Sequence, residues 1–142
     1  MKATTDGLPE TLSGLLNLAI NSMRTLDREA YLADWGEWHL PRDDGFCHVC
    51  FAGAVMALYH EPDKNIIPQD HDTWMKNRLN ALDEIRMGCV GSAAETIGID
   101  RELPVELEEV MVLNEYFKNW EEADVFLGEM EWLRDELIKE GL

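Results

Sequence analysis

Apolar residues recur every three to four positions over most of the chain, which is the spacing of one face of an α-helix. The first such segment, "LPETLSGLLNLAINSMRTLDRE", has Pro9 where a first helical turn accepts proline. Another, "DTWMKNRLNALDEIRMG", ends at Gly88, a residue type that commonly follows a helix. No window alternates convincingly with period two, the pattern of a half-buried strand. The pattern therefore predicts an all-α fold of about five helices in one domain, residues 1–142.

The C-terminal third contains two more predicted helices. "PVELEEVMVLNEYFKNW" starts at Pro104 and has acidic residues in its first turn, which the helix dipole favours. "EEADVFLGEMEWLRDELIKEGL" has the clearest period, with a narrow apolar seam of residues three and four apart: Ala123, Phe126, Met130, Leu133 and Leu137. Because so narrow a seam is similar to that of a coiled coil, it is expected to pack on one partner, either inside the domain or across a dimer, and we predict self-association as a homodimer through helix 121–140.

The segment "FCHVCFAGAVMALYH", residues 46–60, is apolar nearly all round when it is placed on a helix. Cys47, Cys50, Ala54 and Ala57 would share one face, and their small side chains would let a neighbouring helix approach closely. A helix that is apolar on all sides belongs in the interior of a protein. We therefore predict that 46–60 is the central helix of the core and that both cysteines are packing residues.

The same cysteines leave a metal site open as an alternative. Cys47 and Cys50 have a spacing that zinc accepts, and the loop 60–72 contains His60 and His71 as further ligand candidates. A second CxxC pair and a paired HxxxH are absent, and so are the Walker A, GxGxxG, GxSxG and HExxH motifs. The main expectation is therefore a protein without a cofactor and without catalytic residues.

Acidic residues dominate the charge. Asp and Glu number 29 against 12 Lys and Arg, which gives a net charge of −17, and residues 100–142 contain 14 of the acids. Nucleic acids and anionic lipids repel such a chain, whereas a basic protein attracts it. The predicted binding residues are the C-terminal glutamates Glu106, Glu108, Glu109, Glu121 and Glu122, with Trp35 and Trp38 of an aromatic stretch as further candidates.

Neither an apolar leader nor a run of about 18 apolar residues occurs, so we expect a cytoplasmic protein without a membrane span. The segment "FCHVCFAGAVMA" (46–57), preceded by "YLADWGEWH" (31–39), resembles a group of small uncharacterised proteins of tailed bacteriophages and prophages. Those proteins share a segment close to "CxVCxAGAVMA", and "LNALDEIRMGCVGSA" (79–93) is similar to them as well. The resemblance implies an accessory factor acting in the bacterial cytoplasm, and it implies no activity and no functional residues.

Three functional hypotheses follow. The first is a small acidic accessory protein that binds a host or phage protein, in its sharper form by occupying a basic nucleic-acid-binding surface. The second is a metal-binding module or metal-dependent enzyme built on Cys47, Cys50 and the 60–72 loop. The third is a structural, self-assembling helical protein.

Overall fold

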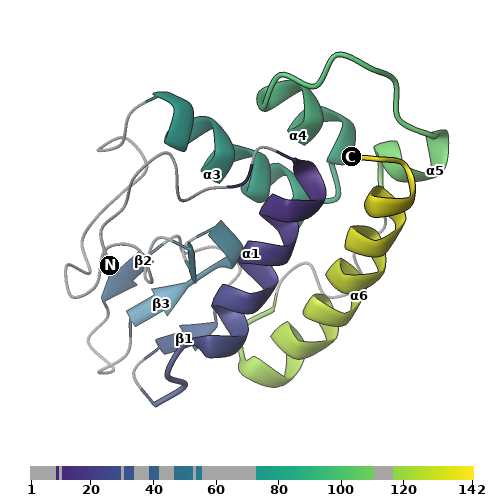
Figure 1. Cartoon of the computed structure of the whole chain (residues 1–142). Helices are drawn as coiled ribbons and strands as arrows, with labels where there is room; N and C mark the ends of the chain where they lie inside the picture. Colours follow the sequence, from purple (N-terminus) through teal and green to yellow (C-terminus); the bar gives the residue numbers. More distant parts are fainter. Residues whose placement is uncertain are drawn as a thin grey trace.

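The computed structural model describes residue 9 and residues 11–29, 31–33, 39–41, 47–52, 54–55, 73–110 and 117–142. Five helices lie in this part of the chain: α1 (Leu12–Thr25), α3 (Thr73–Arg86), α4 (Val90–Thr96), α5 (Val105–Glu108) and α6 (Trp120–Lys139) (Figure 1). The predominance of helix confirms the predicted all-α class. None of the helices in the described residues is long and apolar enough to cross a bilayer.

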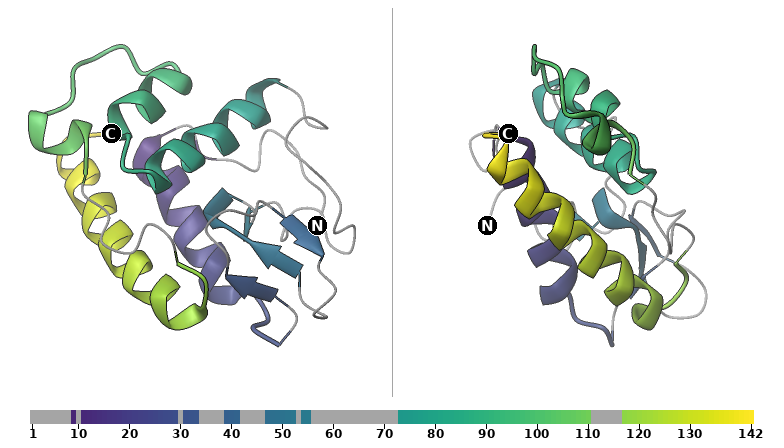
Figure 2. Two further views of the ribbon diagram at one scale, coloured as in Figure 1. Left: turned by 180° about the vertical axis from the view of Figure 1, so that it is seen from behind. Right: turned by 90° about the vertical axis from the view of Figure 1, so that its right-hand side faces the viewer.

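Helices α1 and α6 pack side by side and contribute many of the buried apolar side chains of the core (Figures 1 and 2). Helix α1 begins where the Thr11 hydroxyl accepts a hydrogen bond from the Gly14 N–H at 3.1 Å. Helix α6 begins in the same way, with the Asn119 side chain accepting from the Glu122 N–H at 2.8 Å. Both caps satisfy N–H groups that a helix start leaves without partners, so the two starts are set by local sequence.

The predicted seam of α6 is buried inside the chain. Its five members are fully excluded from solvent and belong to the same cluster as the apolar residues of α1: Ala123, Phe126, Met130, Leu133 and Leu137. The seam is therefore filled by this chain and is not available to a second copy. A homodimer through helix 121–140 would need a different face of the helix.

Residues 46–60 do not begin as a helix, which corrects that prediction. Cys47–Val49 form strand β3, and helical structure starts only after Cys50, at Phe51. Cys50, Phe51, Ala52, Ala54 and Val55 are buried, as predicted, and the Phe51 ring meets the Phe126 ring edge-on at 5.1 Å. The central helix is α1, which contacts both α6 and α3. Residues 46, 53 and 56–60 lie outside the described part.

Backbone pairing with two other strands explains why β3 is a strand and not part of a helix. It pairs in parallel with β1 (Tyr31–Ala33) and antiparallel with β2 (His39–Pro41), in the order β1-β3-β2 (Figure 1). Each strand has three residues, too few for an alternating pattern to be visible in the sequence. Pro41 lies in β2, which is paired on one side only, where the missing N–H costs nothing.

Of the helix predicted from Pro104 to Trp120, the structure describes one turn, α5, which ends at Glu108, while residues 111–116 lie outside the described part. At Glu109 the backbone is extended, with φ −132° and ψ 125°, and this residue forms an antiparallel bridge with Cys89. The Val110 N–H donates to the Gly88 carbonyl at 2.9 Å. Gly88 has φ 86°, a left-handed conformation that glycine adopts without strain. Pairing with this turn thus replaces the helix that the local sequence favours.

Candidate functional site

The five predicted binding glutamates do not form one patch. Glu106, Glu108 and Glu109 are exposed on and just after α5, which lies beside the C-terminal end of α6 (Figure 1). Glu121 and Glu122 are exposed in the first turn of α6, at its opposite end. A helix of 20 residues is about 30 Å long, so the two groups are separated by most of its length.

Glu122 has a structural role. Its carboxylate accepts a hydrogen bond from the Lys118 N–H at 3.0 Å, while its own N–H donates to Asn119. The arrangement is related to the capping box that begins many helices, but Glu122 accepts from the residue before the N-cap Asn119 and not from Asn119 itself. Its neighbour Glu121 takes no part in the cap. Of the two glutamates, Glu121 is therefore the better candidate for contact with a partner.

Arginines of α1 and the chain just after it neutralise one edge of α6. Arg24 holds both carboxylate oxygens of Glu131, at 2.8 and 3.0 Å, and Arg28 holds both of Asp124, at 2.7 and 3.1 Å. The hydrogen bonds from Arg24 lower the pKa of Glu131 below its ordinary value. Arg28 also lies 4.4 Å from the centre of the Trp120 ring, a cation–π contact. The acids on this edge serve to join α6 to the rest of the fold.

The face of α6 that points away from α1 carries apolar residues at helical spacing. Val125, Gly128 and Trp132 are three and four residues apart, and we call these three residues the outer strip. Val125 is 49% exposed and Trp132 is 50% exposed. A Cβ added at Gly128 would meet nothing within 4 Å. In the right-hand view of Figure 2, α6 lies in front of α1.

Acidic residues border the outer strip. Helix α6 contains seven acidic and two basic residues, and helical spacing places four of the acids next to the strip: Glu121, Glu129, Asp135 and Glu136. The two bases pair within the helix, Arg134 with Asp135 at 3.1 Å and Lys139 with Glu136 at 2.7 Å. An apolar strip with a negative border is suited to binding a basic partner, and it contains no group arranged for catalysis.

The other predicted site residues are not assembled by the described structure. Trp35, Trp38, His60 and His71 lie outside the described residues. Cys47 lies in β3, and its side chain is not described, whereas Cys50 is buried and forms no disulfide. Within the described ranges, no group of three or more His, Cys, Asp and Glu side chains is placed to hold a metal ion.

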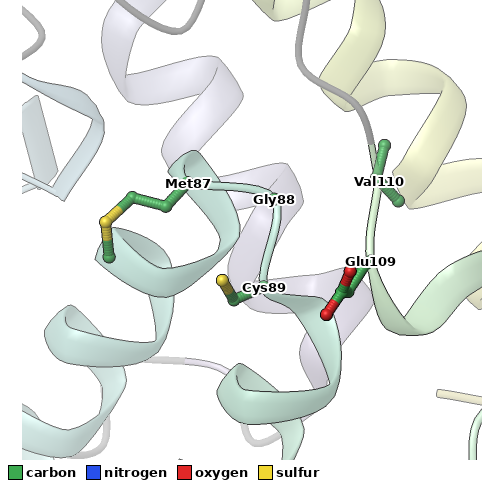
Figure 3. Close-up of a pocket in the computed structure, with 5 residues that line it drawn as sticks. All are labelled: Met87, Gly88, Cys89, Glu109 and Val110. Atoms are coloured by element: carbon green, nitrogen blue, oxygen red, sulfur yellow. The ribbon is translucent and has the colours of Figure 1, made fainter.

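A surface hollow of about 480 Å³ lies where the turn between α3 and α4 meets the extended chain after α5. It is lined by Met87, Gly88, Cys89, Glu109 and Val110 (Figure 3). The Met87 side chain extends away from Cys89 and Glu109, so the lining groups do not converge on one point. Ligand pockets usually have convergent polar groups, and this hollow lacks them.

Helix α3 contains a buried ion pair. Asp83 and Arg86 lie 2.5 Å apart, one helical turn from each other. Burial raises the pKa of Asp83, and the nearby Arg86 guanidinium opposes that increase. A pair fixed within one helix accounts for these charges without a ligand, so it is a structural feature of α3.

The sequence analysis did not identify the outer strip, although a signal for it was present. Val125, Gly128 and Trp132 follow the same spacing of three and four as the buried seam, on the opposite side of the helix. A glycine in the interior of a long helix was a second signal, because it costs stability there. The strip was missed because the stronger seam accounted for the periodicity.

Comparisons with protein-family models, with curated proteins and with solved structures found no match to this chain. The resemblance to phage proteins therefore stays a prediction. A functional proposal has to be argued from the surface of the molecule itself.

Proposed function

We propose that this chain is a small acidic accessory protein of phage type, and that it binds a basic protein through the exposed side of α6. The observation that carries the proposal is the half-exposed Trp132 in an apolar strip with an acidic border. Tryptophan is enriched among the residues that contribute most to protein interfaces. Val125 and Trp132 expose apolar surface on the same side of α6, two turns apart, which a partner could cover.

The acidic border favours a partner whose contacting surface is positively charged. Like charges across an interface are strongly unfavourable, and opposite charges accelerate encounter and select the partner. A net charge of −17 disfavours contact with phosphate backbones. A protein with a basic surface is thus the partner class that this side of α6 fits best.

The distribution of acids favours the general form of the proposal over mimicry of a nucleic acid. A mimic needs a continuous row of free carboxylates, whereas Asp124 and Glu131 are paired with Arg28 and Arg24. The glutamates of α5 lie at the far end of α6 from Glu121. A partner that binds the middle of α6 needs only the acids beside the outer strip.

The proposal is tested by capture from a bacterial lysate with the full chain as bait, at low and high salt. Charge reversal at Glu121 and Asp135 should abolish capture, and the matched reversal at Glu106 and Glu108 should weaken it less. Because border charges are screened over about 8–10 Å, capture should also decrease as salt increases. Glu122 is left unchanged, since it caps α6.

Circular dichroism of each variant should show an unchanged helical signal, because the four positions are exposed. Capture that is insensitive both to salt and to the reversals on α6 would contradict the proposal. The absence of any captured basic protein would contradict it as well.

A further inference from the structure

We propose that the outer strip of α6 is a docking site for one basic amphipathic helix of a partner protein. This inference rests on the proposed function and names the element of the partner that binds. It is carried by the environment of Gly128, by the geometry of the strip and by the charge around it.

Gly128 has no role inside the fold that requires glycine. It lies near the middle of the 20-residue α6, where glycine costs stability relative to alanine. The glycines with a left-handed backbone among the described residues are Gly88, Gly98 and Gly141, so Gly128 is not needed for an unusual φ. Apart from its chain neighbours and the backbone of its own helix turn, no atom lies within 4 Å of the place where its Cβ would be. What glycine provides here is close approach by another molecule.

The strip has the geometry that a helix recognises. Val125 and Trp132 are seven residues apart, two turns, and Gly128 lies between them on the same side. Large side chains on both sides of a glycine leave a notch into which a side chain of a packed helix can insert. Anchors with this spacing are typical of helices that bind along another helix.

The charge selects a basic helix over a second copy of this chain. A second copy would bring another acidic border against Glu121, Glu129, Asp135 and Glu136. Such like-charge contacts are strongly unfavourable. A helix with apolar residues on one side and Lys or Arg beside them would meet both the strip and its border.

The test uses the full chain and a synthetic helix of about 21 residues, in which leucines occupy one face and lysines the rest. A control peptide has the same composition with the leucines scattered over all sides. Titration calorimetry should show saturable binding of one leucine–lysine helix per chain, with weaker binding at higher salt. The control peptide should bind at least about tenfold more weakly, a difference of about 1.4 kcal/mol.

Two substitutions on the strip and one elsewhere on α6 localise the binding. Trp132→Ala should weaken binding by roughly thirtyfold, the loss typical of a central interface residue. Gly128→Gln should weaken it by a similar factor, because a side chain there blocks the notch while the helix stays folded. Ile138→Ala removes an equally exposed apolar side chain from a different side of α6 and should leave binding unchanged.

Several results would overturn the inference. Equal binding of both peptides would mean that α6 attracts any polycation. Full binding by Trp132→Ala and Gly128→Gln would mean that the helix docks elsewhere. A dimer of the chain alone that Trp132→Ala dissolves would identify a second copy as the occupant. Lysate capture that needs Glu121 but tolerates Gly128→Gln would contradict this inference and leave the proposed function standing.

Discussion

On α6, the side turned toward α1 and the side turned away both carry apolar residues at steps of three and four. The inner side has six of them over four turns, Leu127 together with the five residues of the seam, and all are fully buried. The outer side has Val125 and Trp132, both half-exposed, with Gly128 between them. Apolar residues at this spacing form part of the core where they continue over several turns, whereas a short run of them forms an exposed strip on the surface.

The acids of α6 show a parallel difference. On the edge of α6 that faces α1, both carboxylate oxygens of Asp124 accept hydrogen bonds from an arginine, and so do both of Glu131. Beside the outer strip, Asp135 and Glu136 pair only with neighbours on α6 itself. Acidic residues of one helix therefore join α6 to the rest of the fold on one side, and on the other side they form ion pairs within α6 itself.

The largest contrast between the two sides should come from removing one aromatic ring from each. Phe126→Ala leaves a cavity among Phe51, Phe117 and their neighbours and should lower the free energy of unfolding by about 3–5 kcal/mol. Trp132→Ala should lower it by much less, because half of the residue's surface is already exposed to water. Urea unfolding measures both, and equal losses would mean that Trp132 also belongs to the core.

Enlarging a small side chain should distinguish the sides next. Ala123 is fully buried in the seam, so Ala123→Leu overpacks the contact with neighbouring elements and should cost about 1–3 kcal/mol. The matched change Val125→Leu adds a methylene group on the outer side and should be close to neutral. Thermal unfolding followed by circular dichroism measures the difference. Stability retained by Ala123→Leu would show that the seam is loosely packed.

A smaller effect, of opposite sign, is expected at Gly128. Gly128→Ala should raise the free energy of unfolding by about 0.5–1 kcal/mol, because alanine is the better helix former and has open space there. Gly98 is the matched control, since its Cβ position is equally open but its φ is +85°. Gly98→Ala should cost about 1–2 kcal/mol through backbone strain alone. Destabilisation by Gly128→Ala would contradict the open environment assigned to this residue.

The smallest expected effect on stability comes from the ion pair between Arg24 and Glu131, and it depends on pH. The pKa of Glu131 is lowered by hydrogen bonds from Arg24, so its contribution is present above the ordinary value of 4.5. It is lost as the pH falls below that value through the lowered pKa of the folded state. Near pH 7, Glu131→Gln should cost about 0.2–1 kcal/mol, since the pair is exposed and screened.

Unfolding of both proteins between pH 7 and pH 2 tests this assignment. The difference in stability should shrink as the pH decreases. A difference that stays constant with pH would show that Glu131 contributes through packing and not through its charge.

The sequence predicted what kind of site to expect, an acidic surface for a basic partner, but not which residues form it. The excess of acids over the C-terminal third is a property of the sequence, and it predicts a basic partner. Which acids are available depends on the arginines that reach them, and Arg24 and Glu131 are 107 residues apart. The predicted glutamates were also treated as equivalent, whereas Glu122 is a cap and Glu121 is not.

The sequence by itself determined the features whose causes lie within about four residues of each other. The start of α6 follows from Asn119 and Glu122, and its end from Lys139 and Gly141, so the observed Trp120–Lys139 is close to the predicted span. The helical class and the buried state of Cys50 and Ala54 follow in the same way from local apolar spacing.

Only the tertiary structure decided the features whose causes lie far apart in the chain. The helix expected from Pro104 ends at Glu108 because Glu109 and Val110 pair with Cys89 and Gly88, about 20 residues earlier. Cys47–Val49 is a strand because two other segments supply its hydrogen bonds. The side of α6 that became core was set by contact with α1, and the outer strip is the apolar surface that no described element covers. Backbone pairing and the burial of a helix face require partners that a local pattern does not contain, and their free energy exceeds the local preference where they form.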